Sequence, residues 1–469
     1  MAAPSVKHNI LNAALFLLAL FAMLILNVIY LQVFAADDLN KSPLNKRNAQ
    51  NELDISRGSI LDSQGRALAQ NNQNSEDETL RRSYPMGAAM APVTGYLTSF
   101  GSIGVESYAN QELLGMAVNP GKLGPIAQVL HFESGNDVWL TIDADAQQAA
   151  YDGLAGRRGA AVVLDVNTGA VVALVSSPSY NPANVAEEWE NLIGDENSPM
   201  LNRALQGLYP PGSTIKPMIA DWALRIGSTD SHEVFDCTGV LDVGGGYTIQ
   251  ESHEQVHGHI KLDQALVESC NVTFGTLAMR MGAEELSKAF GAYGFDRELE
   301  GELKGEKPHL PNFAALDRGD IAQVGIGQST LLVTPFSMAL LAEAMAGGGV
   351  VMKPYMIEKI VSPEGITVKE TAPQKWFEAT NLERASLIDG WMENVVQRGT
   401  GTSAKVSGVR VTGKTGTAEN PGGDDHAWFI GSAQIGKRKL AFAVIVENGG
   451  GGAEVAAPIA QSIILSMDK

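Results

Sequence analysis

The hydrophobic pattern of the chain begins with one long apolar run. No residue between Asn9 and Ala36 is charged, and positions 10–35 are predominantly apolar. A helix needs about 20 such residues to cross a bilayer, whereas the apolar part of a cleavable signal peptide has only about 7 to 15. The pattern therefore predicts that residues 1–36 form a short tail and a transmembrane anchor.

The orientation of this anchor does not follow from its flanking charges. Only Lys7 precedes the span, whereas Lys41, Lys46, Arg47 and Arg57 follow it. This count would place the tail outside, but long domains are translocated largely regardless of charge. The orientation must come from the chemistry of the remaining chain.

A small module is predicted after the anchor. Positions 57–62 and 91–96 are short, alternating and punctuated by glycine, which favours extended structure. Between them, positions 70–79 are polar with no apolar period, which predicts a flexible loop. We expect this β-containing module to cover residues 37–142.

The pattern then changes to long helices and fully apolar strands. Residues 159–165 and 170–175 flank Asn167-Thr168-Gly169, which predicts a hairpin, and residues 440–446 form another apolar strand. Further positions have helical character, namely 145–154, 335–346, 382–398 and 455–467. Strands at both ends of a long segment, with helices between them, predict one α+β domain over residues 143–469.

Composition excludes some functions and leaves others open. The formal net charge is −19 and the sequence pI is about 4.9, so a surface built to bind nucleic acid is not expected. Cys237 and Cys270 are the two cysteines, and they could pair or remain free thiols.

Two motifs with familiar chemistry stand in unsuitable surroundings. His253-Glu254-Gln255-Val256-His257 matches the zinc peptidase pattern H-E-x-x-H, but three glycines precede it and Gly258 follows, so a loop is expected where that mechanism needs a helix. Residues 408–415 match the P-loop pattern, but positions 409–412 alternate like a strand. We therefore weigh zinc catalysis and ATP binding as minor alternatives.

Three further motifs occur together and in order. Ser213-Thr214-Ile215-Lys216 is Ser-x-x-Lys, Ser269-Cys270-Asn271 is Ser-x-Asn, and Lys414-Thr415-Gly416-Thr417 is Lys-Thr-Gly-Thr. This is the order used by active-site-serine penicillin-recognising enzymes. Each motif alone is weak, since Ser134-Gly135-Asn136 and Ser179-Tyr180-Asn181 also fit Ser-x-Asn.

The chemistry explains why these residue types are needed. A serine hydroxyl requires a nearby base, and Lys216 lies one helical turn after Ser213. We expect Lys216 to be neutral because of burial and the nearby cation of Lys414. Ser269 would relay a proton, and Asn271 would hydrogen-bond Lys216 and substrate.

The third motif would bind a substrate carboxylate. We expect the ammonium of Lys414 and the hydroxyls of Thr415 and Thr417 to do so, with Gly416 between them. The backbone N–H groups of Ser213 and Thr417 would form an oxyanion hole. The implied substrate is a peptide with a free C-terminal carboxylate.

With these motifs, the sequence resembles a class B penicillin-binding protein, most closely the actinobacterial penicillin-binding protein A type. Further matching segments lie throughout the chain, namely residues 57–62, 104–106, 113–115, 140–143, 202–204, 209–216, 325–328 and 334–335. The resemblance implies a serine β-lactamase/transpeptidase-like fold, in which helices flank an antiparallel sheet. A small β-rich module and a transmembrane helix would precede it.

The resemblance also implies an activity and a location. Ser213 would form an acyl-enzyme with the penultimate D-Ala of a lipid II-derived stem peptide, an amine of a neighbouring stem would resolve it, and β-lactams would acylate the same serine. No cofactor and no catalytic metal are expected. The enzyme would be a single-pass membrane protein with an extracytoplasmic catalytic domain and a cytoplasmic tail. Its partners would be a membrane glycosyltransferase and other division or elongation proteins.

Several alternatives remain at this point. A β-lactamase usually carries Glu-x-x-Leu-Asn between the second and third motifs, and none occurs between Asn271 and Lys414. The motifs fit equally a D,D-carboxypeptidase that passes the acyl group to water, or a β-lactam-sensing protein. A zinc peptidase using His253 and His257 is the least favoured.

Overall fold

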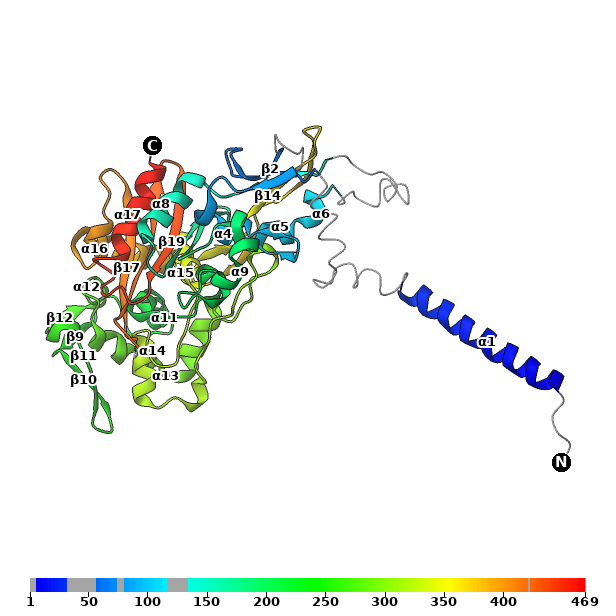
Figure 1. Ribbon diagram of the computed structural model, residues 1–469. Helices are drawn as coiled ribbons and strands as arrows, with labels where there is room; N and C mark the ends of the chain where they lie inside the picture. Colours follow the sequence, from blue (N-terminus) through cyan, green and yellow to red (C-terminus); the bar gives the residue numbers. More distant parts are fainter. Residues whose placement is uncertain (1–5, 32–55, 74–79, 116–133, 421, 469) are drawn as a thin grey trace, which may run out of the picture.

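The computed structural model describes residues 6–31, 56–73, 80–115, 134–420 and 422–468. Its first helix is α1 (Val6–Ile29), drawn in dark blue in Figure 1. The stretch Ile10–Ile29 within it has a mean hydropathy of 2.4 and is long and apolar enough to cross a membrane. This agrees with the predicted anchor, whose last residues, 32–36, lie outside the described ranges.

A five-stranded antiparallel sheet forms the centre of the larger part of the molecule. Its order is β17 (Arg410–Ala418), β18 (His426–Ile435), β19 (Arg438–Val446), β7 (Gly159–Asp165) and β8 (Val171–Ser177). Strands from near residue 160 therefore pair with strands from beyond residue 400. The predicted hairpin, the strand at residues 440–446 and the α+β class are confirmed.

Helices cover both faces of this sheet. On one face α8 (Ala144–Leu154) packs against α17 (Ala456–Met467), and on the other α15 (Pro335–Ala346) contacts β7, β18 and β19 (Figure 1). All four helices predicted from the pattern are present, the fourth being α16 (Leu382–Arg398), which packs against β17.

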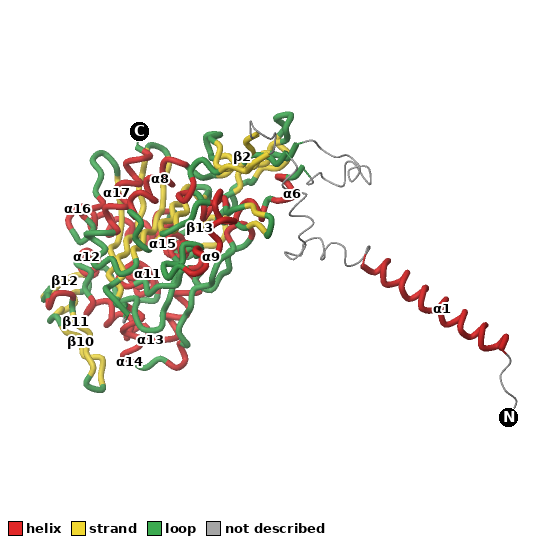
Figure 2. Tube along the Cα trace, viewed as in Figure 1, coloured by secondary structure: helices red, strands yellow, loops and turns green. Residues whose placement is uncertain are grey.

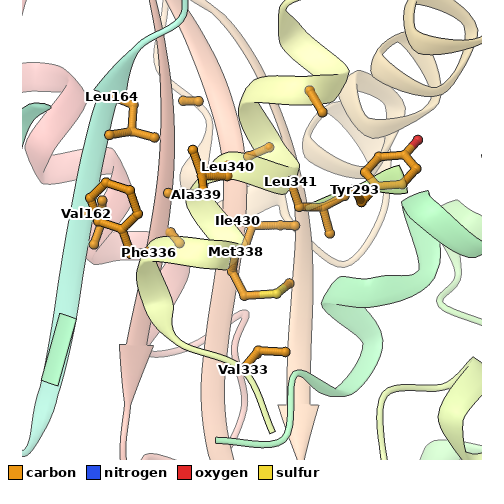
Figure 3. Close-up of a cluster of buried hydrophobic side chains, with 14 of the residues drawn as sticks. Val162, Leu164, Tyr293, Val333, Phe336, Met338, Ala339, Leu340, Leu341 and Ile430 are labelled. Atoms are coloured by element: carbon orange, nitrogen blue, oxygen red, sulfur yellow. The ribbon is translucent and has the colours of Figure 1, made fainter. Parts of the chain in front are cut away.

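The two cores explain why the strands are apolar throughout. Val162 and Leu164 of β7 and Ile430 of β18 face α15, whose Phe336 and Leu340 belong to the same buried cluster (Figure 3). Ala161 and Val163 point to the opposite face, into the core under α8 and α17. Successive side chains of a strand alternate between faces, so a sheet that is covered twice requires an unbroken apolar run.

A helical region with two short β-ribbons extends from the central sheet (Figure 2). Its helices are α11 (Lys216–Arg225), α12 (Leu262–Val267), α13 (Asn271–Ala292) and α14 (Arg318–Gly325). One ribbon pairs β9 (Val234–Cys237) with β12 (Gly258–Lys261), and the other pairs β10 (Val240–Gly244) with β11 (Tyr247–Gln250). The smaller elements include β13 (Val350–Met352), β16 (Lys375–Glu378), α9 (Val185–Gly194) and α10 (Arg203–Gln206).

A second sheet of six strands lies at the other end of the body. Its order is β15 (Thr367–Glu370), β14 (Ile357–Val361), β6 (Asp137–Leu140), β1 (Ile60–Leu61), β2 (Ala67–Gln73) and β3 (Leu80–Ser83). The strands β14 and β15 come from the segment predicted to be catalytic. The short helices α4 (Ala91–Thr94), α5 (Gly104–Tyr108) and α6 (Asn110–Leu113) and the ribbon of β4 (Leu97–Thr98) with β5 (Gly101–Ser102) accompany this sheet.

Two local predictions in this module are wrong. Residues 70–73, predicted to be loop, form the end of β2 and pair with β3 from Gln70–Ser83 to Gln73–Leu80. Their polar side chains gave no apolar period, but backbone pairing at the end of a sheet does not need one. Residues 91–94, predicted to be extended, form α4, with Pro92 in its first turn. Residues 74–79 of the predicted loop lie outside the described ranges.

Candidate active site

Ser213 lies on a single 3-10 turn, η5 (Gly212–Ile215), which leads directly into α11. Gly212 has a φ of 54°, and a Cβ there would lie 2.8 Å from the carbonyl oxygen of Thr417 on β17. Glycine therefore permits both the turn and the close approach of the sheet edge. Pro217 occupies the first turn of α11, as predicted, where no intrahelical partner for an N–H exists.

Lys216 is fully buried, and its amine hydrogen-bonds the Ser-x-Asn segment. Its Nζ donates to the carbonyl oxygen of Ser269 at 2.6 Å, to Asn271 Oδ1 at 2.8 Å and to Ser269 Oγ at 3.4 Å. Among the described residues no hydrogen bond joins this amine to Ser213 Oγ. Apo geometry of this kind is compatible with a base that moves onto its nucleophile when substrate binds.

The Ser-x-Asn segment joins α12 to α13. Ser269 has a φ of 61°, a conformation that is uncommon for any residue other than glycine. Asn271 is the first residue of α13, and its side-chain nitrogen donates to the carbonyl oxygen of Gln250 at 3.0 Å. The carboxylate of Glu251 accepts hydrogen bonds from the backbone N–H groups of Asn271 and Val272, both at 2.8 Å.

The Lys-Thr-Gly-Thr motif occupies the edge strand β17, next to Ser213. Lys414 is fully buried and donates to Ser269 Oγ at 2.8 Å and to the carbonyl oxygen of Thr415 at 3.0 Å. The Thr415 hydroxyl hydrogen-bonds Thr400 Oγ1 at 2.6 Å, whereas Thr417 is exposed. A Cβ on Gly416 would meet Thr214 Cγ2 at 2.8 Å, so glycine allows β17 and η5 to touch.

The structure thus brings all three motifs together around one hydroxyl group. Ser269 Oγ lies within hydrogen-bond distance of both lysine amines, on elements that are 53 and 145 residues away in sequence. Sequence reasoning did not find Thr400 or Glu251, because they support the motif residues from other segments and no local pattern marks them.

The pKa shifts of the two lysines differ from the expectation that Lys216 is neutral and Lys414 is charged. Burial lowers the pKa of Lys216 to about 8, although Glu251 and Cys270 raise it in part. Burial also lowers the pKa of Lys414 well below its ordinary value, and the Lys216 cation adds to the effect. Among the described residues no carboxylate hydrogen-bonds either amine, so the cationic form is disfavoured at Lys414 as well as at Lys216.

The two competing motifs lack the backbone that their chemistry requires. The P-loop match falls on β17, whose residues from Arg410 onward are hydrogen-bonded to β18, leaving no loop to surround a phosphate. In the H-E-x-x-H match, residues 252–254 form a short 3-10 turn and Gly258 begins β12. The two histidines do not lie on one α-helix, which the zinc peptidase mechanism requires. Cys237 and Cys270 are both free thiols.

Comparison with known proteins agrees with this arrangement. Residues 159–465, well over half of the chain, match the penicillin binding protein transpeptidase domain, and residues 57–119 match the penicillin binding protein A dimerisation domain. The chain is 31% identical to the peptidoglycan D,D-transpeptidase PbpA of Mycolicibacterium smegmatis, with 97% of each chain covered.

Solved structures show the same fold. Penicillin-binding protein A from M. tuberculosis, in an imipenem acyl-enzyme complex, superposes with a TM-score of 0.81 at 29% identity, covering 89% of this chain and 100% of that one. The D,D-transpeptidase domain of a peptidoglycan glycosyltransferase from Eggerthella lenta gives 0.79 at 32% identity, covering 88% and 98%. The resemblance and the transpeptidase fold inferred from the motifs are confirmed, and the chain belongs to the penicillin-binding protein transpeptidase family.

Proposed function

We propose that this protein cross-links peptidoglycan as a serine D,D-transpeptidase and that β-lactams acylate it. The observation that carries the proposal is the meeting of Lys216 and Lys414 on the hydroxyl of Ser269, beside the turn that bears Ser213. This arrangement provides a nucleophile, a base and a path for a proton. The relatives named above are D,D-transpeptidases, and one forms an acyl-enzyme with imipenem.

In the first half-reaction, Ser213 Oγ attacks the carbonyl carbon of the penultimate D-Ala of a stem peptide. The neutral Lys216 amine accepts the hydroxyl proton, and the backbone N–H groups of Ser213 and Thr417 stabilise the oxyanion, an effect worth about 3 kcal/mol for each donor. Ser269 passes its hydroxyl proton to the departing nitrogen as the peptide bond breaks and takes up the proton held by Lys216, which returns that amine to its neutral form. The terminal D-Ala leaves and Ser213 remains acylated.

In the second half-reaction, an amine of a neighbouring stem attacks the acyl-enzyme. The amine loses its proton to the same base, and Ser213 regains its hydroxyl when the ester bond breaks. The terminal carboxylate of the donor would lie at Lys414 and Thr417, where a negative charge would favour the charged form of Lys414. Asn271 would hydrogen-bond the donor amide.

We also propose that α1 anchors the enzyme and that the catalytic domain lies outside the cytoplasm, because cross-linking acts on exported stem peptides. A membrane glycosyltransferase of the elongation or division type would supply the glycan strands. A reporter enzyme that is active only outside the cytoplasm, fused after Met467, should be active. If that reporter were inactive and a reporter that works only in the cytoplasm were active at the same position, the proposed topology would be contradicted.

A fluorescent penicillin tests the proposed chemistry. The full-length protein should be labelled, Ser213→Ala should lose the label, and Ser231→Ala, which changes a partly exposed serine outside the three motifs, should keep it. Absence of label on the wild type would contradict the proposal. Incubation with a stem pentapeptide and an acceptor amine should give the cross-linked product, and release of D-Ala with water as the only acceptor would indicate a carboxypeptidase instead.

A further inference from the structure

Four side chains converge directly behind the Ser-x-Asn segment. Cys237 ends β9, Glu251 follows β11, His257 precedes β12, and Cys270 precedes α13. One ligand atom from each, two sulfurs, one oxygen and one nitrogen, lie within 4.8 Å of one another. Three of the four residues are buried, and the side chain of His257 is only 9% exposed.

The spacing of these atoms fits a tetrahedron around a small cation. Cys270 Sγ lies 3.1 Å and Cys237 Sγ 3.4 Å from Glu251 Oε1. His257 Nδ1 lies 3.3 Å from Cys237 Sγ and 3.9 Å from Glu251 Oε1. Zinc distances of about 2.0 Å to nitrogen or oxygen and about 2.3 Å to sulfur give tetrahedral edges of about 3.3 to 3.8 Å.

Neighbouring groups favour ligand roles for the sulfur and the imidazole. The backbone N–H and the hydroxyl of Thr273 both donate to Cys270 Sγ, at 3.3 and 3.2 Å, as expected around a thiolate ligand. His257 Nε2 is buried and hydrogen-bonds nothing in the described protein. The ring can therefore keep its proton on Nε2 and present the lone pair of Nδ1 to the cluster.

We propose that Cys237, Glu251, His257 and Cys270 bind one structural Zn²⁺ ion. Two thiolates with an imidazole and a carboxylate are a donor set that zinc prefers, and four protein ligands leave no open position for catalysis. Binding would release the two thiol protons and form two Zn–S bonds, with no change of oxidation state. The site differs from the H-E-x-x-H hypothesis because only His257 of that motif takes part.

The ion would stabilise the active-site segment from behind. Cys270 stands between Ser269 and Asn271, and both of these contact Lys216. Through the ion, Cys270 would be linked to Cys237 at the end of β9, to Glu251 and to His257. These links would keep the neighbouring Ser269 in its left-handed conformation. The zinc ligands are therefore positioning residues, and among the described residues no hydrogen bond joins any of them to Ser213.

Elemental analysis of the full-length protein tests this proposal directly. The protein should be purified in detergent through a tag that binds no metal and should contain about one zinc per chain. His257→Ala and Cys237→Ser should lower the zinc content at least about tenfold. His259→Ala, which changes an exposed histidine of β12, and His253→Ala should retain the ion.

A spectroscopic measurement covers the case in which the ligand variants do not fold. Wild-type protein depleted of zinc and given Co²⁺ under reducing conditions should show the thiolate-to-cobalt charge-transfer band and tetrahedral visible bands. A protein with no zinc after incubation with Zn²⁺ and no such bands, or a Cys237–Cys270 disulfide in the purified chain, would overturn the proposal. So would equal loss of zinc in His253→Ala and His257→Ala. Zinc content is measured without penicillin, so a protein that binds zinc but is not labelled, or is labelled but binds no zinc, would separate this inference from the proposed function.

Discussion

Ser269 is the residue at which the two buried lysines meet, and its geometry has a cost. Its left-handed φ of 61° is unfavourable for a side chain with a Cβ by roughly 1 kcal/mol. In this conformation its hydroxyl oxygen accepts hydrogen bonds from Lys414 at 2.8 Å and Lys216 at 3.4 Å, while its carbonyl oxygen also accepts from Lys216. One residue therefore fixes the relative positions of the base and the second amine.

Removing this hydroxyl should slow acylation without unfolding the protein. Ser269→Ala keeps the backbone contact to Lys216 but loses both side-chain contacts, which are worth about 0.5 to 1.5 kcal/mol each. We expect the rate constant for acylation by penicillin to fall about 10- to 100-fold, with a melting temperature lowered by only about a few degrees.

The matched control for this variant is Ser179→Ala, in a second Ser-x-Asn sequence. The Ser179 hydroxyl is buried without a hydrogen-bond partner among the described residues, so its removal should leave acylation unchanged. A rate for Ser269→Ala within about twofold of the wild type would show that the hydroxyl does not transfer or position a proton.

The lowered pKa of Lys216 gives acylation a defined pH dependence. With the neutral amine as the proposed base, acylation should rise about tenfold per pH unit below the pKa and level off above it. Burial lowers that pKa to about 8, so the inflection should lie there instead of near the ordinary value of 10.5. The rate constant should be measured from about pH 6 to about pH 9.5 with a β-lactam that has no group titrating in this range. A rate that falls over the lower half of this range would exclude Lys216 as the base.

At the scale of elements, the contact between η5 and β17 places Ser213, the proposed nucleophile, next to the Lys-Thr-Gly-Thr motif, the proposed carboxylate site. Gly416→Ala would place a Cβ at 2.8 Å from Thr214 Cγ2 and 3.1 Å from the carbonyl oxygen of Pro211. Because the Pro211 contact is to backbone, the strand must move. We expect a loss of about 1 to 3 kcal/mol of stability and at least a tenfold slower acylation.

Gly390→Ala is the control for this substitution. Gly390 lies within α16, and a Cβ there would meet nothing within 4 Å. Alanine should therefore stabilise the helix by about 0.5 to 1 kcal/mol and leave acylation unchanged. Denaturant unfolding and penicillin acylation measure both variants. Equal behaviour of the two alanine variants would mean that the η5–β17 contact can relax.

Local signals explain which elements could be predicted from the sequence. The helix α15 begins where predicted because Thr334 and Ser337 form a reciprocal cap and Pro335 fits the first turn. The strand β2 was missed because its polar residues at 70–73 have no apolar face. The three catalytic motifs were readable because spacing within each is local, but their meeting at Ser269 depends on packing between distant elements.

At the scale of the whole molecule, the six-stranded sheet combines strands from residues 37–142 with strands from residues 143–469, which the sequence pattern assigned to different domains. In that sheet β6 pairs with β14, more than 200 residues later, from Leu140–Ile357 to Asp137–Val361. No local pattern indicates such a partner, because a strand of alternating burial can pair with any other. The division at residue 142 stays a prediction, and it must accommodate β14 and β15, which follow that residue in the chain but belong to the six-stranded sheet.

A buried ion cluster at the other end of this sheet allows that division to be tested. Glu106 is fully buried, and its carboxylate binds Arg57 Nε at 2.7 Å and Arg82 Nε at 2.6 Å. Glu106→Ala would leave two nearly buried guanidinium groups without their carboxylate, which typically costs about 3 to 5 kcal/mol. Glu300→Ala removes an exposed partner of Lys353 and should cost less than about 1 kcal/mol.

If the N-terminal module unfolds separately, the loss of stability caused by Glu106→Ala should be confined to the six-stranded sheet. Hydrogen exchange of Glu106→Ala should then increase in β1, β2 and β6, while β17 and β18 remain protected and penicillin still labels Ser213 at a rate within about threefold of the wild type. The return of β14 to this sheet makes it the strand through which disruption would spread, so its exchange marks the boundary. Loss of protection in both sheets, together with loss of labelling, would show that the module and the transpeptidase domain unfold as one cooperative unit.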